Sequence, residues 1–218
     1  MTTFALIHGG GGSAHDWHLV EAELRARGHR TVAVDLPTAD PGAGLWDYAD
    51  TVVEAVGEHD GLVVAGMSWG GFIAPLAAQR AHADAIVMIT AMIPKPGETP
   101  ADWWENSGRP PSQSDDPYEI YLHDVPRDVA EAAVAHNNPG IERMRMDKVV
   151  AEPWPLPAWP DIPTRYLLCR DDRFFTADFV RRHVAERLGI VPDEMPGGHF
   201  VALSRPKELA EYLVTILT

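Results

Sequence analysis

The chain has few of the features that mark several classes of protein. Its single cysteine, Cys169, excludes an internal disulfide and fits a reducing compartment such as the cytoplasm. The ten histidines are scattered, without an H-E-x-x-H motif or a Cys/His pairing, so we expect no metal site. No apolar run approaches the length of a membrane span, and the first one, at 4–7, lacks the basic flank of a signal peptide.

Positive charge is also scarce. The formal net charge is -14, the isoelectric point is about 5.0, and Lys and Arg form no cluster. Nucleic acid and anionic membranes are therefore not expected as partners, and we interpret the acidity as a source of solubility. The partner that we expect is a small-molecule substrate, while the oligomeric state stays open.

What the chain does have is the alternation of short apolar runs and helical patterns that predicts a parallel sheet built from βαβ units. Its 218 residues suit one α/β domain over 1–218. We predict helices after Ser13-Ala14-His15-Asp16 (a capping-box pattern), over 44–57, after residue 70, from Thr176 to a C-cap at Gly189, and from Ser204 onward. The predicted strands are 4–8, 31–35, 61–66, 85–91, 164–169 and 190–195.

The segment from about 94 to 160 interrupts this alternation. It is rich in proline and tryptophan, and it is too long for a simple loop in a compact domain. We interpret it as a cap inserted between two strands, with one short helix over 127–136. Trp103-Trp104 and Met144–Met146 are expected to pack inside the cap, and some of these side chains are candidates for an apolar pocket.

The most informative motif is Gly66-Met67-Ser68-Trp69-Gly70, which follows the apolar run 62–65 and precedes a helical pattern. It has the form of a nucleophile elbow, in which a strained turn between strand and helix presents a serine above the sheet. Glycines two residues before and after the serine remove Cβ atoms that would collide in such a turn. Ser68 is therefore the candidate nucleophile.

A serine hydroxyl needs a histidine to take its proton and a carboxylate to orient that histidine. Asp171-Asp172 follow the predicted strand 164–169, and His199 follows the last strand in the context Gly197-Gly198-His199-Phe200. The chain order serine, acid, histidine is the one that this elbow implies. The spacing favours Asp172 over Asp171 as the acid.

The oxyanion hole of such a site needs two backbone donors. The residue after the nucleophile, Trp69, is expected to give one. The glycine run that follows His8 is expected to give the other, from Gly10 or from Gly11. His8 itself is interpreted as a histidine that pins this loop.

The chain resembles the α/β-hydrolase superfamily, and within it the small esterase branch that includes plant methylesterases and hydroxynitrile lyases. The resemblance spans nearly the whole chain and rests on the motifs at 8–10, 66–71, 169–172 and 197–199. It implies an α/β-hydrolase fold with about six mostly parallel strands, flanking helices and a cap that matches 94–160. The first two strands of the larger fold are missing, which this branch tolerates.

The resemblance further implies that Ser68, Asp172 and His199 form a catalytic triad and that Gly10 and Trp69 form the oxyanion hole. The family often has histidine before the serine, where this chain has Met67. Lyases of the branch carry a lysine after the catalytic histidine and a threonine in the first oxyanion loop. This chain has Phe200 and Gly9 there, which argues against cyanohydrin chemistry.

We therefore predict a cofactor-free serine hydrolase, a carboxylesterase for a small or medium apolar ester. Because a fold does not fix a reaction, two alternatives stay open. One is a lyase, a cyclase or another cofactor-free enzyme of biosynthesis on the same scaffold. The other is a small-molecule receptor derived from a hydrolase, against which the complete triad weighs.

Overall fold

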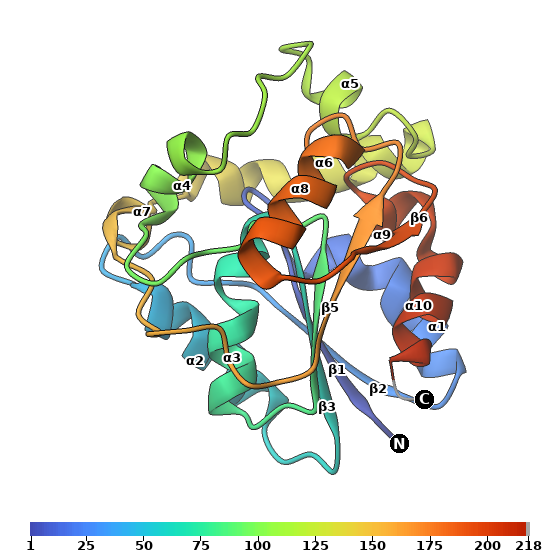
Figure 1. The fold of residues 1–218 in the computed structure, drawn as a ribbon. Helices are drawn as coiled ribbons and strands as arrows, with labels where there is room; N and C mark the ends of the chain where they lie inside the picture. The colour runs from blue at the N-terminus through green and yellow to red at the C-terminus, as the bar shows by residue number, and fades with distance from the viewer. Residues whose placement is uncertain (217–218) are drawn as a thin grey trace.

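A computed structural model describes residues 1–216, and these residues contain a parallel sheet with the strand order β2-β1-β3-β4-β5-β6 (Figure 1). Every predicted strand is present, although the last one shrinks to three residues. The α/β fold predicted from the sequence is thereby confirmed. The strands are β1 (Thr3–Ile7), β2 (Arg30–Val34), β3 (Leu62–Met67), β4 (Ala85–Ile89), β5 (Thr164–Cys169) and β6 (Asp193–Met195).

The central strands are apolar throughout because helices cover both faces of the sheet. On one face, α2 (Leu45–Val56), α3 (Ala74–Arg80) and α8 (Ala177–Leu188) pack into one part of the core. On the other face, α1 (His18–Ala26), α9 (Val201–Ser204) and α10 (Pro206–Thr215) form the second part. The predicted helix over 44–57 corresponds to α2, and Gly189 ends α8 in the left-handed conformation, as predicted.

The parallel register brings the carboxyl ends of neighbouring strands to one edge of the sheet. Ile7 of β1 pairs with Gly66 of β3, and Cys169 of β5 pairs with Met195 of β6. The loops after β1, β3, β5 and β6 therefore all start at this edge. This edge is where open α/β sheets place their sites.

The inserted segment 94–160 lies over that edge and is more helical than the sequence predicts (Figure 1). The predicted helix over 127–136 is present, but it continues to Arg143, and the other helices of the segment were not predicted. Pro139 and Gly140 disfavour a helix interior, yet α6 continues past them to Arg143. Its earlier turns pack on the sheet domain. The segment contains α4 (Pro100–Asn106), α5 (Pro117–Tyr121), α6 (Arg127–Arg143) and α7 (Asp147–Ala151).

A buried ion pair anchors the start of this segment to the sheet domain. Arg187 of α8 binds the Glu98 carboxylate, and both side chains are almost fully buried. Arg187 also donates to the carbonyl of Ile93 at 2.7 Å, and the Trp103 indole donates to the same oxygen at 3.0 Å. The chain is thus held in place where it leaves the sheet.

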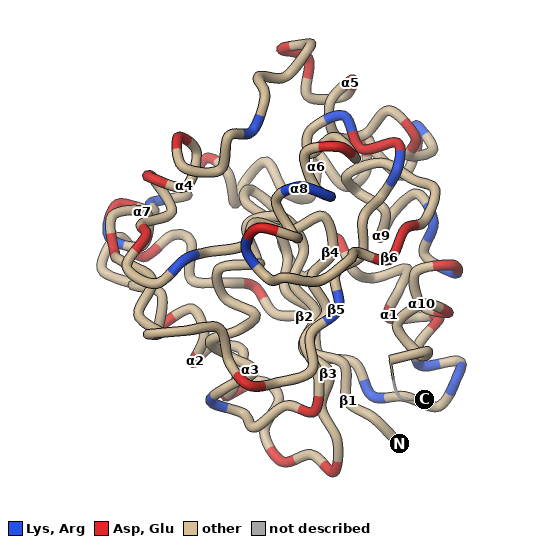
Figure 2. The backbone as a smooth tube through the Cα atoms, viewed as in Figure 1, with Lys and Arg blue, Asp and Glu red and all other residues tan. Residues whose placement is uncertain are grey.

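Charged residues are spread over the outside of the molecule. Figure 2 shows Lys and Arg dispersed among more numerous Asp and Glu. Among residues 1–216, no helix has the length and apolar character that crossing a membrane requires.

The buried His183 of α8 makes the free energy of unfolding depend on pH. Its ring stacks on Phe179 with 5.0 Å between centroids, and burial, together with nearby Arg187, Lys95 and Arg182, lowers its pKa to about 3. In the unfolded chain the pKa is about 6.5, so between these values only the unfolded state binds the proton. Protonation therefore favours unfolding as pH falls below about 6.5.

We expect His183→Phe to remove this dependence while it preserves the ring stack. Between pH 7.5 and pH 5.0 the free energy of unfolding of the wild type should fall by about 2 kcal/mol more than that of the variant. Urea unfolding at both pH values measures the difference. Equal losses for the two proteins would show that His183 is not the responsible group.

Candidate active site

The turn after β3 has the strained geometry that the elbow motif predicts. Ser68 has φ 52°, a left-handed conformation that is rare for residues with a side chain. A Cβ on Gly66 would lie 2.8 Å from the Ala74 Cβ, and one on Gly70 would lie 2.8 Å from the His8 carbonyl oxygen. Both glycines are therefore required by the close packing of the turn. η2 (Ser68–Phe72) and then α3 follow the serine directly.

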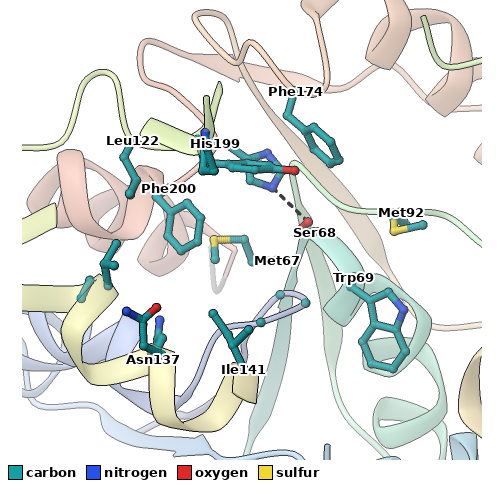
Figure 3. Close-up of a pocket in the computed structure, with 18 of the residues that line it drawn as sticks. Met67, Ser68, Trp69, Met92, Leu122, Asn137, Ile141, Phe174, His199 and Phe200 are labelled. Atoms are coloured by element: carbon teal, nitrogen blue, oxygen red, sulfur yellow. Dashed lines mark hydrogen bonds between the residues drawn. The ribbon is translucent and has the colours of Figure 1, made fainter. Parts of the chain in front are cut away.

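Ser68, His199 and Asp172 form one chain of hydrogen bonds. Ser68 Oγ lies 2.9 Å from His199 Nε2 (Figure 3). His199 Nδ1 lies 2.8 Å from Asp172 Oδ2. All three residues are buried, with His199 2% exposed. An Nδ1–H that donates to the carboxylate leaves Nε2 as an acceptor for the serine proton.

The two adjacent aspartates have different partners. Besides His199, Asp172 accepts the backbone N–H groups of Phe174 at 2.7 Å and Phe175 at 3.0 Å through Oδ1. Asp171 instead accepts the Gly197 N–H at 2.9 Å and so joins its own loop to the histidine loop. The geometry thus favours Asp172 as the acid, as the spacing does.

Two residues of the inserted segment also hold these loops. Asp124 accepts the N–H of Gly198 at 2.7 Å, directly before His199. His123 Nε2 donates to the Asp171 carbonyl at 2.9 Å, directly before Asp172. Sequence reasoning singled out neither residue, because only the folded segment brings them to the two loops.

The glycine loop after β1 lies against the nucleophile. A Cβ on Gly9 would lie 3.0 Å from the Ser68 Cβ, and one on Gly10 would lie 3.6 Å from the Trp69 Cβ. Gly10 and Trp69, the predicted oxyanion donors, thus lie side by side next to Ser68. Gly11 has φ 72° and packs toward Ile141 of α6.

His8 fixes the shape of this loop. Its Nδ1–H donates to the Gly9 carbonyl at 2.7 Å, and its Nε2 accepts the Leu36 N–H at 3.2 Å. Burial lowers the pKa of His8, which favours the neutral ring that this pair of bonds requires. His8 is therefore a structural residue of the loop, in line with the interpretation from the sequence.

A cavity of about 350 Å³ opens on Ser68 and is lined mainly by apolar side chains. It extends to both sides of the serine: Met67, Phe200 and Leu122 lie on one side, and Met92 and Trp69 lie on the other (Figure 3). Apart from His199, the residues that line it in the described part of the chain carry no acidic or basic side chain. The cavity is therefore suited to an uncharged molecule.

Aromatic rings surround the imidazole of His199. Phe174, Tyr121 and Phe175 have ring centroids at 5.1, 5.4 and 5.5 Å from it. Burial raises the pKa of Tyr121, so its hydroxyl stays neutral. Sequence reasoning singled out none of these residues, although Phe174 and Phe175 lie only two and three positions after Asp172.

The candidate pocket residues of the inserted segment separate into different environments. Trp103 is fully buried in the core, whereas Trp104 is 45% exposed and lines the cavity. Met146 packs at the margin of the core instead. Burial raises the pKa of the Cys169 thiol well above its usual value, so this cysteine is not a thiolate nucleophile.

No cluster of three or more His, Cys, Asp or Glu side chains suited to a metal ion occurs among the described residues. The features that stand out at this edge of the sheet are therefore the serine, histidine and aspartate, the glycine loop and the apolar cavity.

The sequence profile of the alpha/beta hydrolase family matches residues 4–212. The chain therefore belongs to the alpha/beta hydrolase family, which confirms the predicted family and the prediction of a hydrolase-type enzyme.

Individual relatives agree with this assignment. Norfluorocurarine synthase 2 of Strychnos nux-vomica is 23% identical over 251 residues, covering 98% of this chain and 94% of the relative. Methylesterase 7 of Arabidopsis thaliana is 32% identical over 111 residues, covering 45% of this chain and 43% of the relative. Among solved structures, a pyrethroid hydrolase from Sphingobium faniae JZ-2 has a TM-score of 0.76 at 22% identity, with 99% and 96% covered, and so shares the fold.

Proposed function

We propose that this protein is a serine carboxylesterase in which Ser68, His199 and Asp172 are the catalytic triad. The observation that carries the proposal is the continuous hydrogen-bonded chain from Asp172 to Ser68, which ends in an apolar cavity. The esterase name of a relative such as Methylesterase 7 supports the same reaction class.

In the first half of the reaction, Ser68 Oγ attacks the ester carbonyl carbon while His199 Nε2 accepts the hydroxyl proton. Asp172 stabilises the imidazolium that forms. The negative charge on the carbonyl oxygen is stabilised by the N–H groups of Gly10 and Trp69. The intermediate then collapses, and His199 returns the proton to the departing alkoxide, which leaves an acyl group on Ser68.

In the second half, water enters and attacks the acyl carbonyl with His199 Nε2 as general base. The same donors stabilise the second oxyanion. Collapse of this intermediate breaks the bond to Ser68 Oγ, which recovers its proton from His199. The products are one alcohol and one carboxylic acid, and no cofactor takes part.

The substrate class follows from the cavity. Its volume of about 350 Å³ lies near the lower end of the ~300–1,000 Å³ of small-molecule pockets. Space on both sides of Ser68 accommodates the acyl part and the alcohol part of one ester (Figure 3). We infer that the segment 94–160 acts as a cap, since Tyr121, Leu122 and Ile141 from it line the cavity. The substrate is therefore a small or medium, uncharged, apolar ester.

Hydrolysis of p-nitrophenyl acetate, butyrate, hexanoate and decanoate tests this assignment. We expect kcat/KM to be highest for the short and medium chains and to fall at decanoate, since the cavity cannot enclose the longest chain. Equal turnover of all four esters would contradict a cavity-limited substrate. No turnover of any ester would contradict the esterase proposal.

A second candidate is a lyase or cyclase of biosynthesis on the same scaffold, and the similarity to a protein named norfluorocurarine synthase 2 supports a biosynthetic role. Among such reactions, cyanide release from a cyanohydrin is disfavoured, because the apolar Phe200 stands beside His199 at the cavity. Turnover in ¹⁸O-labelled water separates the two candidates. An esterase places one ¹⁸O in the acid product, whereas a lyase or cyclase places none.

A further inference from the structure

One side chain of the proposed cap binds both residues of the capping box that follows the glycine loop. Asn137 of α6 accepts the Ser13 hydroxyl proton through Oδ1 at 2.6 Å and donates through Nδ2 to Asp16 Oδ1 at 2.8 Å. Ser13 and Asp16 are the capping-box residues of η1 (Ala14–Trp17), and Asn137 also lines the cavity.

Asp16 is a fully buried carboxylate directly behind the glycine loop. Its Oδ2 accepts the Ser13 N–H at 3.2 Å, and a Cβ on Gly12 would lie 2.2 Å from that oxygen. Gly12 in turn donates its N–H to the Gly9 carbonyl at 3.2 Å. A shift of Asp16 would therefore move Gly12, and through the Gly12–Gly9 hydrogen bond it would move Gly9, next to the proposed oxyanion donor Gly10.

A buried carboxylate needs strong hydrogen-bond donors. Burial raises the pKa of Asp16, and the hydrogen bond from Asn137 acts in the opposite direction. Within the capping box the carboxylate receives one long bond, from Ser13 N–H. The shorter bond comes from the cap.

The junction between η1 and α6 has a second contact. The His15 ring stacks on the His136 ring with 4.1 Å between centroids, directly before Asn137. Burial and, after it, the neighbouring rings of His18 and His136 lower the pKa of His15. The cap therefore meets the loop at a specific interface rather than at a chance surface contact.

We propose that Asn137 is a positioning residue that holds the oxyanion loop in its catalytic conformation from the cap. This inference rests on the proposed esterase function. It gives the cap two roles, since one helix both walls the cavity and fixes the loop that supplies the Gly10 N–H. Loss of the Asn137 bonds should therefore weaken transition-state stabilisation rather than ground-state binding.

The test exchanges the charges of the Asp16–Asn137 pair. Asn137→Asp places a second carboxylate against Asp16, so the loop is pushed away. Asp16→Asn together with Asn137→Asp restores the bond with donor and acceptor exchanged: the oxygen at 16 still accepts from Ser13 N–H, and the carboxylate at 137 still accepts from Ser13 Oγ–H. In Asp16→Asn alone, the Asn137 amide can turn so that its oxygen accepts from the new NH₂ group at 16, which restores a hydrogen bond between the two residues.

We expect Asn137→Asp to lower kcat for p-nitrophenyl butyrate by about 100-fold, the effect of displacing one oxyanion donor, with KM changed by less than about threefold. Asp16→Asn alone should cost about tenfold or less, and the double variant should return to within about tenfold of the wild type. The affinity for phenylethylboronic acid, whose tetrahedral adduct occupies the oxyanion hole, should follow kcat across the series.

Ala132→Asp is the matched control, because it adds the same charge to an exposed position of α6. Circular dichroism and thermal unfolding check the fold of each variant, and rescue by the double variant excludes general damage. Unchanged kcat in Asn137→Asp, or a double variant as slow as the worse single variant, would overturn the inference alone. Wild-type protein that hydrolyses no ester, or Ser68→Ala as active as wild type, would overturn the proposed function and the inference with it.

Discussion

Ser68→Ala is expected to lower kcat for p-nitrophenyl butyrate by about 10⁴-fold or more. The substitution removes the oxygen that forms the acyl-enzyme, and His199 then has no hydroxyl to activate. Since the cavity walls are unchanged, KM and the unfolding midpoint should stay close to the wild-type values. Parallel steady-state kinetics of the two proteins measure the effect.

Exposed histidines hydrolyse activated esters slowly on their own, so the control is the variant itself with the acetyl, butyryl and hexanoyl esters. A residual rate that does not vary with chain length is background chemistry. A variant that retains the wild-type rate and the wild-type chain-length preference would show that another residue is the nucleophile.

Asp172→Asn should lower kcat by about 10⁴-fold through the tautomer of His199. Asp172 Oδ1 accepts two backbone N–H groups, from Phe174 and Phe175. The oxygen of an asparagine is held in that place, so its NH₂ group faces His199 Nδ1. The imidazole then carries its proton on Nε2 and cannot accept the proton of Ser68.

Asp171→Asn is the matched comparison. An asparagine at 171 keeps an oxygen for the Gly197 N–H, the partner of Asp171 at 2.9 Å, and makes no change at His199. We expect a loss of less than about tenfold. The pH dependence of kcat/KM for the two variants provides a second readout. Equal losses in both variants would contradict the assignment of Asp172 as the acid.

The sequence predicts the sheet and the order of the three candidate catalytic residues because both depend on local patterns. A buried parallel strand is a short apolar run, and each candidate residue lies at the end of a predicted strand or in the loop that follows it. The elbow motif is also local in sequence, and a Cβ at Gly66 is excluded by Ala74 and Gly70 of the same turn. A Cβ at Gly70 is instead excluded by Ile7 and His8 of the glycine loop, which the fold brings beside the turn. The choice between Asp171 and Asp172 needs side-chain directions, which the structure supplies.

The segment 94–160 was predicted less well, for a physical reason. Its helices cover the sheet domain instead of extending the sheet, so they depend on tertiary contacts such as those of Ala130 and Ala133, which no local pattern shows. The contacts of Asn137, Asp124 and Tyr121 depend on where the segment 94–160 meets loops that are more than 40 residues away along the chain. No periodicity or motif in the sequence predicts these long-range contacts.

The most direct test of the account is to trap the acyl group. Wild-type protein is mixed with p-nitrophenyl butyrate, quenched in acid during turnover, digested and analysed by mass spectrometry. We predict a butyryl group on the peptide that contains Ser68 and at no other residue, with Ser68→Ala unlabelled. Product release without any adduct on that peptide, or a butyryl group that accumulates on a different residue at the rate of turnover, would contradict the account.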